Sequence, residues 1–75
     1  MKLKRDADLN LFLQTVRQCH DEIYFTTPEN DSLNLQSVLS QYLFASLAGK
    51  PELLQAGEIL CRDMTDMLRL SHFLE

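Results

Sequence analysis

Residues 32–51 read SLNLQSVLSQYLFASLAGKP, and this stretch decides which fold the sequence predicts. It carries no charge before Lys50, and its apolar residues recur at the spacing of a helix. Gly49 is the residue type that commonly closes a helix, and Pro51 is tolerated in a first helical turn. The stretch therefore predicts a helix that ends at about residue 48, a tight turn, and another helix that begins at residue 51.

The start of the helix before this turn has two interpretations. Thr27 caps it with Pro28 in the first helical position, or Asp31 or Ser32 caps a helix that begins at Leu33. We favour the second start, because the side chains of Asp31 and Ser32 compete with helical hydrogen bonds. The expected helix then covers residues 32–48.

A first helix is expected over residues 6–25. Asp6 or Asp8 is suited to cap it, and Pro28 disfavours helical geometry in the residue before it. The apolar positions alternate in steps of three and four, as one helix face requires, at Leu9, Phe12, Val16, Cys19 and Ile23.

A third helix is expected over residues 51–74. Its apolar positions also follow steps of four and three, at Leu53, Gly57, Leu60, Met64 and Met67. A glycine inside a helix costs about 1 kcal/mol relative to alanine, so Gly57 indicates either a close helix crossing or simple tolerance.

Together these patterns predict one all-α domain over residues 1–75, a small three-helix bundle. The second and third helices, residues 32–48 and 51–74, form a hairpin. Residues 1–5 are expected to be a basic, disordered tail.

Charge and composition exclude several classes of function. The 75 residues carry a formal net charge of −4, and three of the seven basic side chains lie in the first five residues. The rest of the chain is acidic, which argues against direct binding of nucleic acid. There is no run of about 20 apolar residues to span a membrane. Without an export signal, Cys19 and Cys61 are expected to be reduced thiols in the cytoplasm.

The candidate metal ligands and nucleophiles have the wrong spacing for chemistry. Cys19, His20, Cys61 and His72 are the only soft ligands, and neither C-x-x-C nor H-x-x-x-H occurs. A three-helix domain of this size has no room for an ordinary ligand pocket. We therefore predict no enzyme activity, no metal, no cofactor and no small-molecule substrate.

The remaining function is binding of a protein. Flexible Met64 and Met67 suit a surface that adapts to a partner, and the uncharged second helix is apolar on more than one side. We predict a non-enzymatic acidic adaptor or regulator, of a bacterial kind, that binds a partner protein or forms a dimer. The expected partner-binding residues are Leu43, Phe44, Leu47, Leu60, Met64, Met67, Leu68, Leu70, Phe73 and Leu74.

Two alternatives remain open. In size, acidity and helical hairpin the chain resembles the small helical chaperones of bacterial secretion systems. That resemblance implies a chaperone that shields an apolar helix of its client in a secretion or assembly system. A small metal-binding or enzymatic protein is the third hypothesis.

Overall fold

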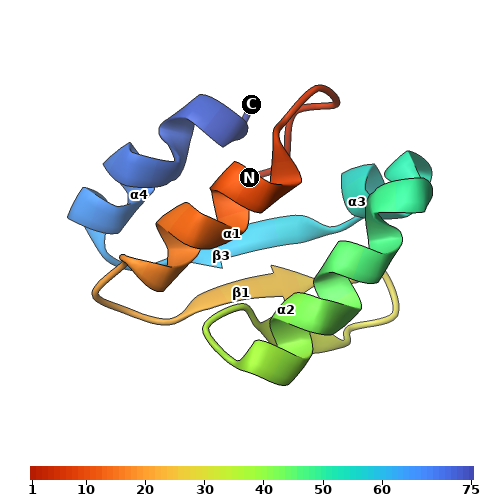
Figure 1. Cartoon of the computed structure of the whole chain (residues 1–75), viewed down its shortest axis with the longest axis horizontal. Coiled ribbons are helices and arrows are strands. Elements are labelled where there is room, and N and C mark those ends of the chain that lie inside the picture. The colour runs from red at the N-terminus through yellow and green to blue at the C-terminus, as the bar shows by residue number, and fades with distance from the viewer.

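The computed structural model describes residues 1–75 and has both helices and a sheet (Figure 1). In chain order the elements are α1 (Leu9–Arg17), β1 (Ile23–Thr26), β2 (Ser32–Asn34), α2 (Val38–Ala45), η1 (Ser46–Gly49), α3 (Pro51–Ala56), β3 (Glu58–Cys61), α4 (Met64–Leu70) and η2 (Ser71–Phe73), where η marks a 3-10 helix.

The predicted all-α three-helix bundle is wrong. Three strands form an antiparallel sheet in the order β2-β1-β3, with Tyr24 paired to Asn34 on one side and to Leu60 on the other. The helices cover one face of this sheet, and they lie in front of it in Figure 1. The protein is therefore a two-layer domain of mixed α and β structure.

The first predicted helix, residues 6–25, is too long because its last part is β1. α1 starts where the sequence indicates, since the Asp8 carboxylate accepts a hydrogen bond from the Leu11 amide at 3.1 Å. It ends at Arg17, and β1 then alternates buried Ile23 and Phe25 with half-buried residues between them. The β-branched and aromatic residues of β1 favour a strand once two neighbours can pair with it.

The second predicted helix, residues 32–48, begins too early at either proposed start. Residues 27–31 form the loop of a β-hairpin, with Asn30 in a left-handed conformation at φ 69°. β2 then pairs with β1, and α2 starts only at Val38. The boundary at Gly49 and Pro51 is confirmed, because η1 ends and α3 begins there.

The third predicted helix, residues 51–74, is interrupted by β3. The backbone becomes extended at Gly57, and along β3 the buried Ile59 alternates with the exposed Leu60. Steps of three and four had placed Gly57, Leu60 and Met64 on one helix face. In the fold these residues belong to three different segments.

The expected disordered tail at residues 1–5 instead packs against the domain. The Ile59 amide donates to the Met1 carbonyl at 2.6 Å, so this segment runs beside β3. The Lys4 amide donates to the Phe73 carbonyl at 2.8 Å, and Leu3 forms an isolated bridge with Leu74. Leu3 is 2% exposed because these contacts place it in the core.

The core lies between the sheet and the helices. It contains all four phenylalanines, which come from α1, β1, α2 and η2. Phe12 contacts Phe44 and Phe73 at ring-centroid distances of 5.8 and 5.5 Å, and Phe25 contacts Phe44 at 5.1 Å. This aromatic cluster joins both layers of the domain.

A buried carboxylate holds α4 against the turn between α1 and β1. Asp66 is fully buried, and its oxygens accept hydrogen bonds from the amides of His20 at 2.9 and 3.0 Å and of Asp21 at 2.9 Å. Desolvation raises the pKa of Asp66, but these amide donors outweigh it, so the net pKa lies below the ordinary value. The carboxylate replaces the helical partners that these amides lose where α1 ends.

Gly57 is required by close approach to β1. A Cβ atom here would lie 2.7 Å from the Thr26 carbonyl oxygen and would collide with the Phe25 ring. We expect Gly57→Ala to lower the free energy of unfolding by about 1–3 kcal/mol. The matched control is Gly49→Ala, which meets nothing within 4 Å and is expected to be neutral or stabilising by up to about 1 kcal/mol. Urea denaturation measures both, and equal effects would contradict the close approach.

Asp66→Asn is expected to destabilise the protein at neutral pH, because the amide side chain replaces one acceptor oxygen with a donor. A carboxylate with a lowered folded-state pKa stabilises the protein above its unfolded-state pKa, and this contribution is lost as the pH falls through the folded-state value. The difference between wild type and Asp66→Asn should therefore shrink below about pH 4. Thermal unfolding at pH 7 and pH 3 tests this, with the exposed Asp6→Asn as control. A difference that does not change with pH would count against the hydrogen-bonded carboxylate.

Candidate protein-docking surface

The inner side of α2 is held in place by two buried side chains. Phe44 belongs to the aromatic cluster and is fully buried. The side-chain amide of Gln41 donates to the Leu35 carbonyl at 2.7 Å, and its oxygen accepts from Arg17 Nε at 3.0 Å. These contacts determine which side of α2 faces solvent.

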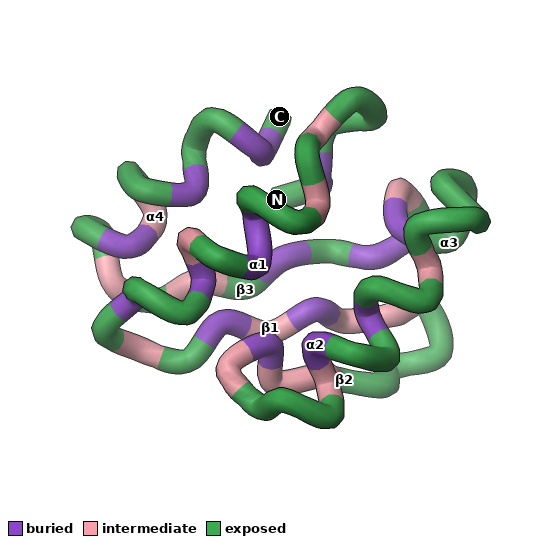
Figure 2. The backbone as a smooth tube through the Cα atoms, in the orientation of Figure 1, coloured by how far each residue is buried: buried purple, intermediate pink, exposed green.

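The opposite side of α2 is apolar and exposed. Val38 is 81% exposed, Leu39 68%, Tyr42 74% and Leu43 45%. We call these four residues the outer α2 face. They are neighbours on the helix surface because Val38 and Tyr42, and likewise Leu39 and Leu43, lie four positions apart. In Figure 2 α2 is exposed over most of its length, with few buried positions.

No charge occurs on α2 or on η1. Large apolar groups on an uncharged helix are costly in water, at about 25 cal/mol per Å² of apolar surface. Because Phe44 and Gln41 already fill the inner side, the outer α2 face cannot turn inward without breaking the core. Within the chain, this face stays exposed.

A second group of exposed apolar residues lies on β3 and α4. Leu60 is 48% exposed, Met64 76% and Leu68 68%. In Figure 1, α1 lies between α4 and α2, and it contacts both of them. The single working surface predicted from the third helix and the end of the second is therefore divided between two regions.

The structure distributes the predicted partner-binding residues over core and surface. Phe44, Leu70, Phe73 and Leu74 are buried, so they belong to the core and are not available to a partner. Leu47 and Met67 are partly buried. The exposed members are Leu43, Leu60, Met64 and Leu68.

Sequence reasoning missed the most exposed apolar residues of α2, namely Val38, Leu39 and Tyr42. The absence of charge indicates that this helix is a contact surface. The expected three-helix bundle, however, assigned the contact to other residues of the helix. The available signal was Gln41, since a polar residue on an apolar helix is a possible inward hydrogen-bonding group. Gln41 lies in the core, where it is 6% exposed.

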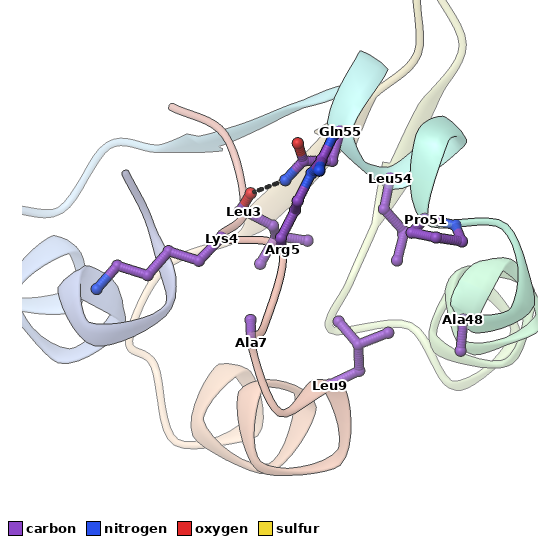
Figure 3. Close-up of a pocket in the computed structure, with 9 residues that line it drawn as sticks. All are labelled: Leu3, Lys4, Arg5, Ala7, Leu9, Ala48, Pro51, Leu54 and Gln55. Atoms are coloured by element: carbon purple, nitrogen blue, oxygen red, sulfur yellow. Dashed lines mark hydrogen bonds between the residues drawn. The ribbon is translucent and has the colours of Figure 1, made fainter.

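The cavities offer little room for a small ligand. Figure 3 shows one of about 120 Å³ between the N-terminal segment and α3, where Gln55 Nε2 donates to the Leu3 carbonyl at 2.9 Å. Ordinary ligand pockets occupy about 300–1,000 Å³. The cavity is lined by Leu3, Lys4, Arg5, Ala7, Leu9, Ala48, Pro51, Leu54 and Gln55.

A wider depression of about 410 Å³ adjoins this cavity. It is lined by Arg5, Pro51, Glu52 and Gln55, without a single hydrophobic side chain. A third hollow of about 230 Å³ lies between the β-hairpin loop and α3, where Phe25 and Leu53 are among its walls. None of the three combines an apolar enclosure of ordinary ligand size with several converging polar groups.

The two thiols are poorly suited to act as nucleophiles. Burial, with a further contribution from the nearby Asp66 carboxylate, raises the pKa of Cys19 to about 11. Burial likewise raises the pKa of Cys61. Both thiols are free and stay protonated at neutral pH, whereas a nucleophile or metal ligand needs the thiolate. No three His, Cys, Asp or Glu side chains gather in a way that could hold a metal ion.

The uncovered face of the sheet carries a polar network beside the exposed Leu60, which pairs with Tyr24. Glu22 accepts hydrogen bonds from the Tyr24 hydroxyl and, at 2.9 Å, from Asn34 Nδ2. The hydrogen bond to Glu22 raises the pKa of the Tyr24 hydroxyl. This exposed network satisfies its own polar groups, so the outer α2 face is the stronger candidate for a docking surface.

No helix of the protein has the length and apolar character that crossing a bilayer requires. No family model, curated protein or solved structure matches the chain. The structure is a small two-layer α/β domain with an exposed apolar helix face.

The two sides of α2 are expected to respond differently to substitution. Phe44→Ala should lower the free energy of unfolding by about 3–5 kcal/mol, because it removes a ring from the centre of the core. Leu39→Glu should change it by less than about 0.5 kcal/mol, because the side chain is exposed and glutamate suits an early helix position. Chemical denaturation at low protein concentration measures both. A large loss for Leu39→Glu would show that the outer α2 face stabilises the fold itself.

Proposed function

We propose that this protein is a non-enzymatic docking domain, a small adaptor or regulator that binds protein through the outer α2 face. One observation carries the proposal. Four large apolar side chains stay exposed on an uncharged helix whose inner side is fixed by Phe44 and Gln41. A helix face that packs on a partner needs this surface and no catalytic group.

The docking surface is preorganised. α2 contacts β2 and α1, and every buried polar side-chain atom in the protein has a hydrogen-bond partner. A surface held rigid before binding loses less conformational entropy when the partner docks. This supports an adaptor that is folded before it binds, in preference to a chaperone that folds only with its client.

The proposed setting is the cytoplasm. Cys19 and Cys61 are both free thiols, which is the usual state in a reducing compartment. The proposed partner is therefore another cytoplasmic protein or a second copy of this chain.

A photo-crosslinking residue at position 39 tests the proposed function in cells of the source organism. We expect one defined protein adduct, because Leu39 lies in the middle of the outer α2 face. The adduct should disappear when Tyr42→Asp is added. The same residue at the exposed position 14 on α1 is the control and should yield no adduct. Absence of an adduct at position 39, or equal adducts at both positions, would refute docking at this face.

A further inference from the structure

The outer α2 face has the properties of a self-complementary interface. We infer that its occupant is a second copy of this chain, with the two α2 helices antiparallel across a twofold axis near Tyr42. This inference rests on the proposed function, and it names the partner for the same surface. Two observations, on charge and on shape, support it, and the length of the helix sets the expected strength of the dimer.

Charge distribution favours a second copy at α2 over any other part of the surface. The net charge is −4, so two copies repel each other wherever charged surfaces meet. Residues 32–49 contain no charge, and α2 and η1 lie within them. At α2 two acidic copies meet without placing like charges in contact.

Shape along the helix favours an antiparallel arrangement. The first part of the exposed side presents Val38 and Leu39, the middle presents Tyr42 and Leu43, and the last part presents the small exposed residues Ala45 and Ser46. In an antiparallel pair the bulky end of one copy lies over the small end of the other, with Tyr42 near the axis. A twofold axis makes both halves of the contact identical, as isologous dimers require.

The short length of α2 and η1 limits the size of a dimer interface. At ordinary helix geometry α2 and η1 together are about 20 Å long, and the molecule measures 28 × 23 × 20 Å. A specific interface needs about 500–600 Å² from each partner. This is about a tenth to an eighth of the 4867 Å² accessible surface of the chain. An interface at the lower size limit predicts a dimer that forms in the micromolar range and dissociates on dilution.

The exposed apolar residues of α4 are less suited than α2 to contact a second copy. Met64 and Leu68 lie among charged residues, with Arg62 before the helix and Arg69 directly after Leu68, and both arginines are exposed. A second copy placed on α4 would have to remove water from these charged groups, a cost that the uncharged α2 avoids. α4 therefore supplies a matched control surface.

Sedimentation equilibrium of the purified chain over about 5–500 µM tests the inference. We expect the wild-type mass to rise from that of one 8.7 kDa chain towards twice that value. Leu39→Glu places two added carboxylates at the interface and should weaken the dimer by at least about 30-fold. Leu68→Glu is the control, because Leu39 and Leu68 are both 68% exposed, and it should leave dimerisation within about twofold of wild type.

Salt supplies a second, independent measurement. Screening shortens the range of the repulsion between two acidic copies to about 10 Å at 0.1 M salt. A dimer formed through the uncharged α2 should therefore have a lower dissociation constant at about 0.5 M NaCl than at about 0.05 M NaCl. Weaker association at high salt would indicate charge pairs at the interface and would overturn the assignment to α2.

Other outcomes separate this inference from the proposed function. A wild-type chain that stays monomeric throughout overturns the second copy, while a position-39 adduct with a different protein would still support docking at α2. A dimer abolished by Leu68→Glu and kept by Leu39→Glu places the interface on α4 and refutes the inference. Circular dichroism checks that each variant is folded. If Leu39→Glu unfolds, Leu39→Gln, also a good helix former, replaces it.

Discussion

The contact of Phe44 with Phe12 and Phe25 is the interaction on which the rest of this structure depends. Through Phe44, α2 is tied to α1 on one side and to the central strand β1 on the other, at ring-centroid distances of 5.8 and 5.1 Å. Phe73 extends the same cluster to the C-terminal turn. A chain of 75 residues has little apolar surface to bury, so a single shared cluster has to join both layers. The rotation of α2 about its own axis follows from that cluster.

Once Phe44 and Gln41 define the inner side of α2, the outer α2 face has no partner within the chain. The consequence is an exposed apolar surface on an uncharged helix, held rigid by contacts on its other side. A helix that was free to turn would hide Leu39 at the expense of Ser40 or Gln41. In this fold a turn would remove Phe44 from the aromatic cluster, and the loss of a phenylalanine ring from a core costs about 3–5 kcal/mol. The proposed docking role and the proposed second copy both arise from this competition.

Further contacts outside the aromatic cluster also hold the segments together. Asp66 binds the two amides at the turn into β1, and Gly57 allows β3 to approach Phe25 without a side chain in between. The sequence predicted part of this. Asp8 was correctly placed as a helix cap, and Gly57 was considered as a site of close approach, although in a helix. The sequence does not indicate that Asp66 is buried, because a carboxylate on a helix surface is normally exposed. Its partners lie 45 and 46 residues away, and no local pattern indicates them.

The sequence by itself determined the local features: the start of α1, the boundary between Gly49 and Pro51, and the uncharged apolar character of residues 32–49. These depend on the backbone preferences and polarity of neighbouring residues. Only the tertiary structure decided that residues 23–26 and 58–61 are strands. Their apolar residues fit both a helical period and a strand period, and the choice was made by pairing between segments more than 30 residues apart. The same pairing decided that Phe44 is buried and Leu39 exposed, which no periodicity within α2 specified.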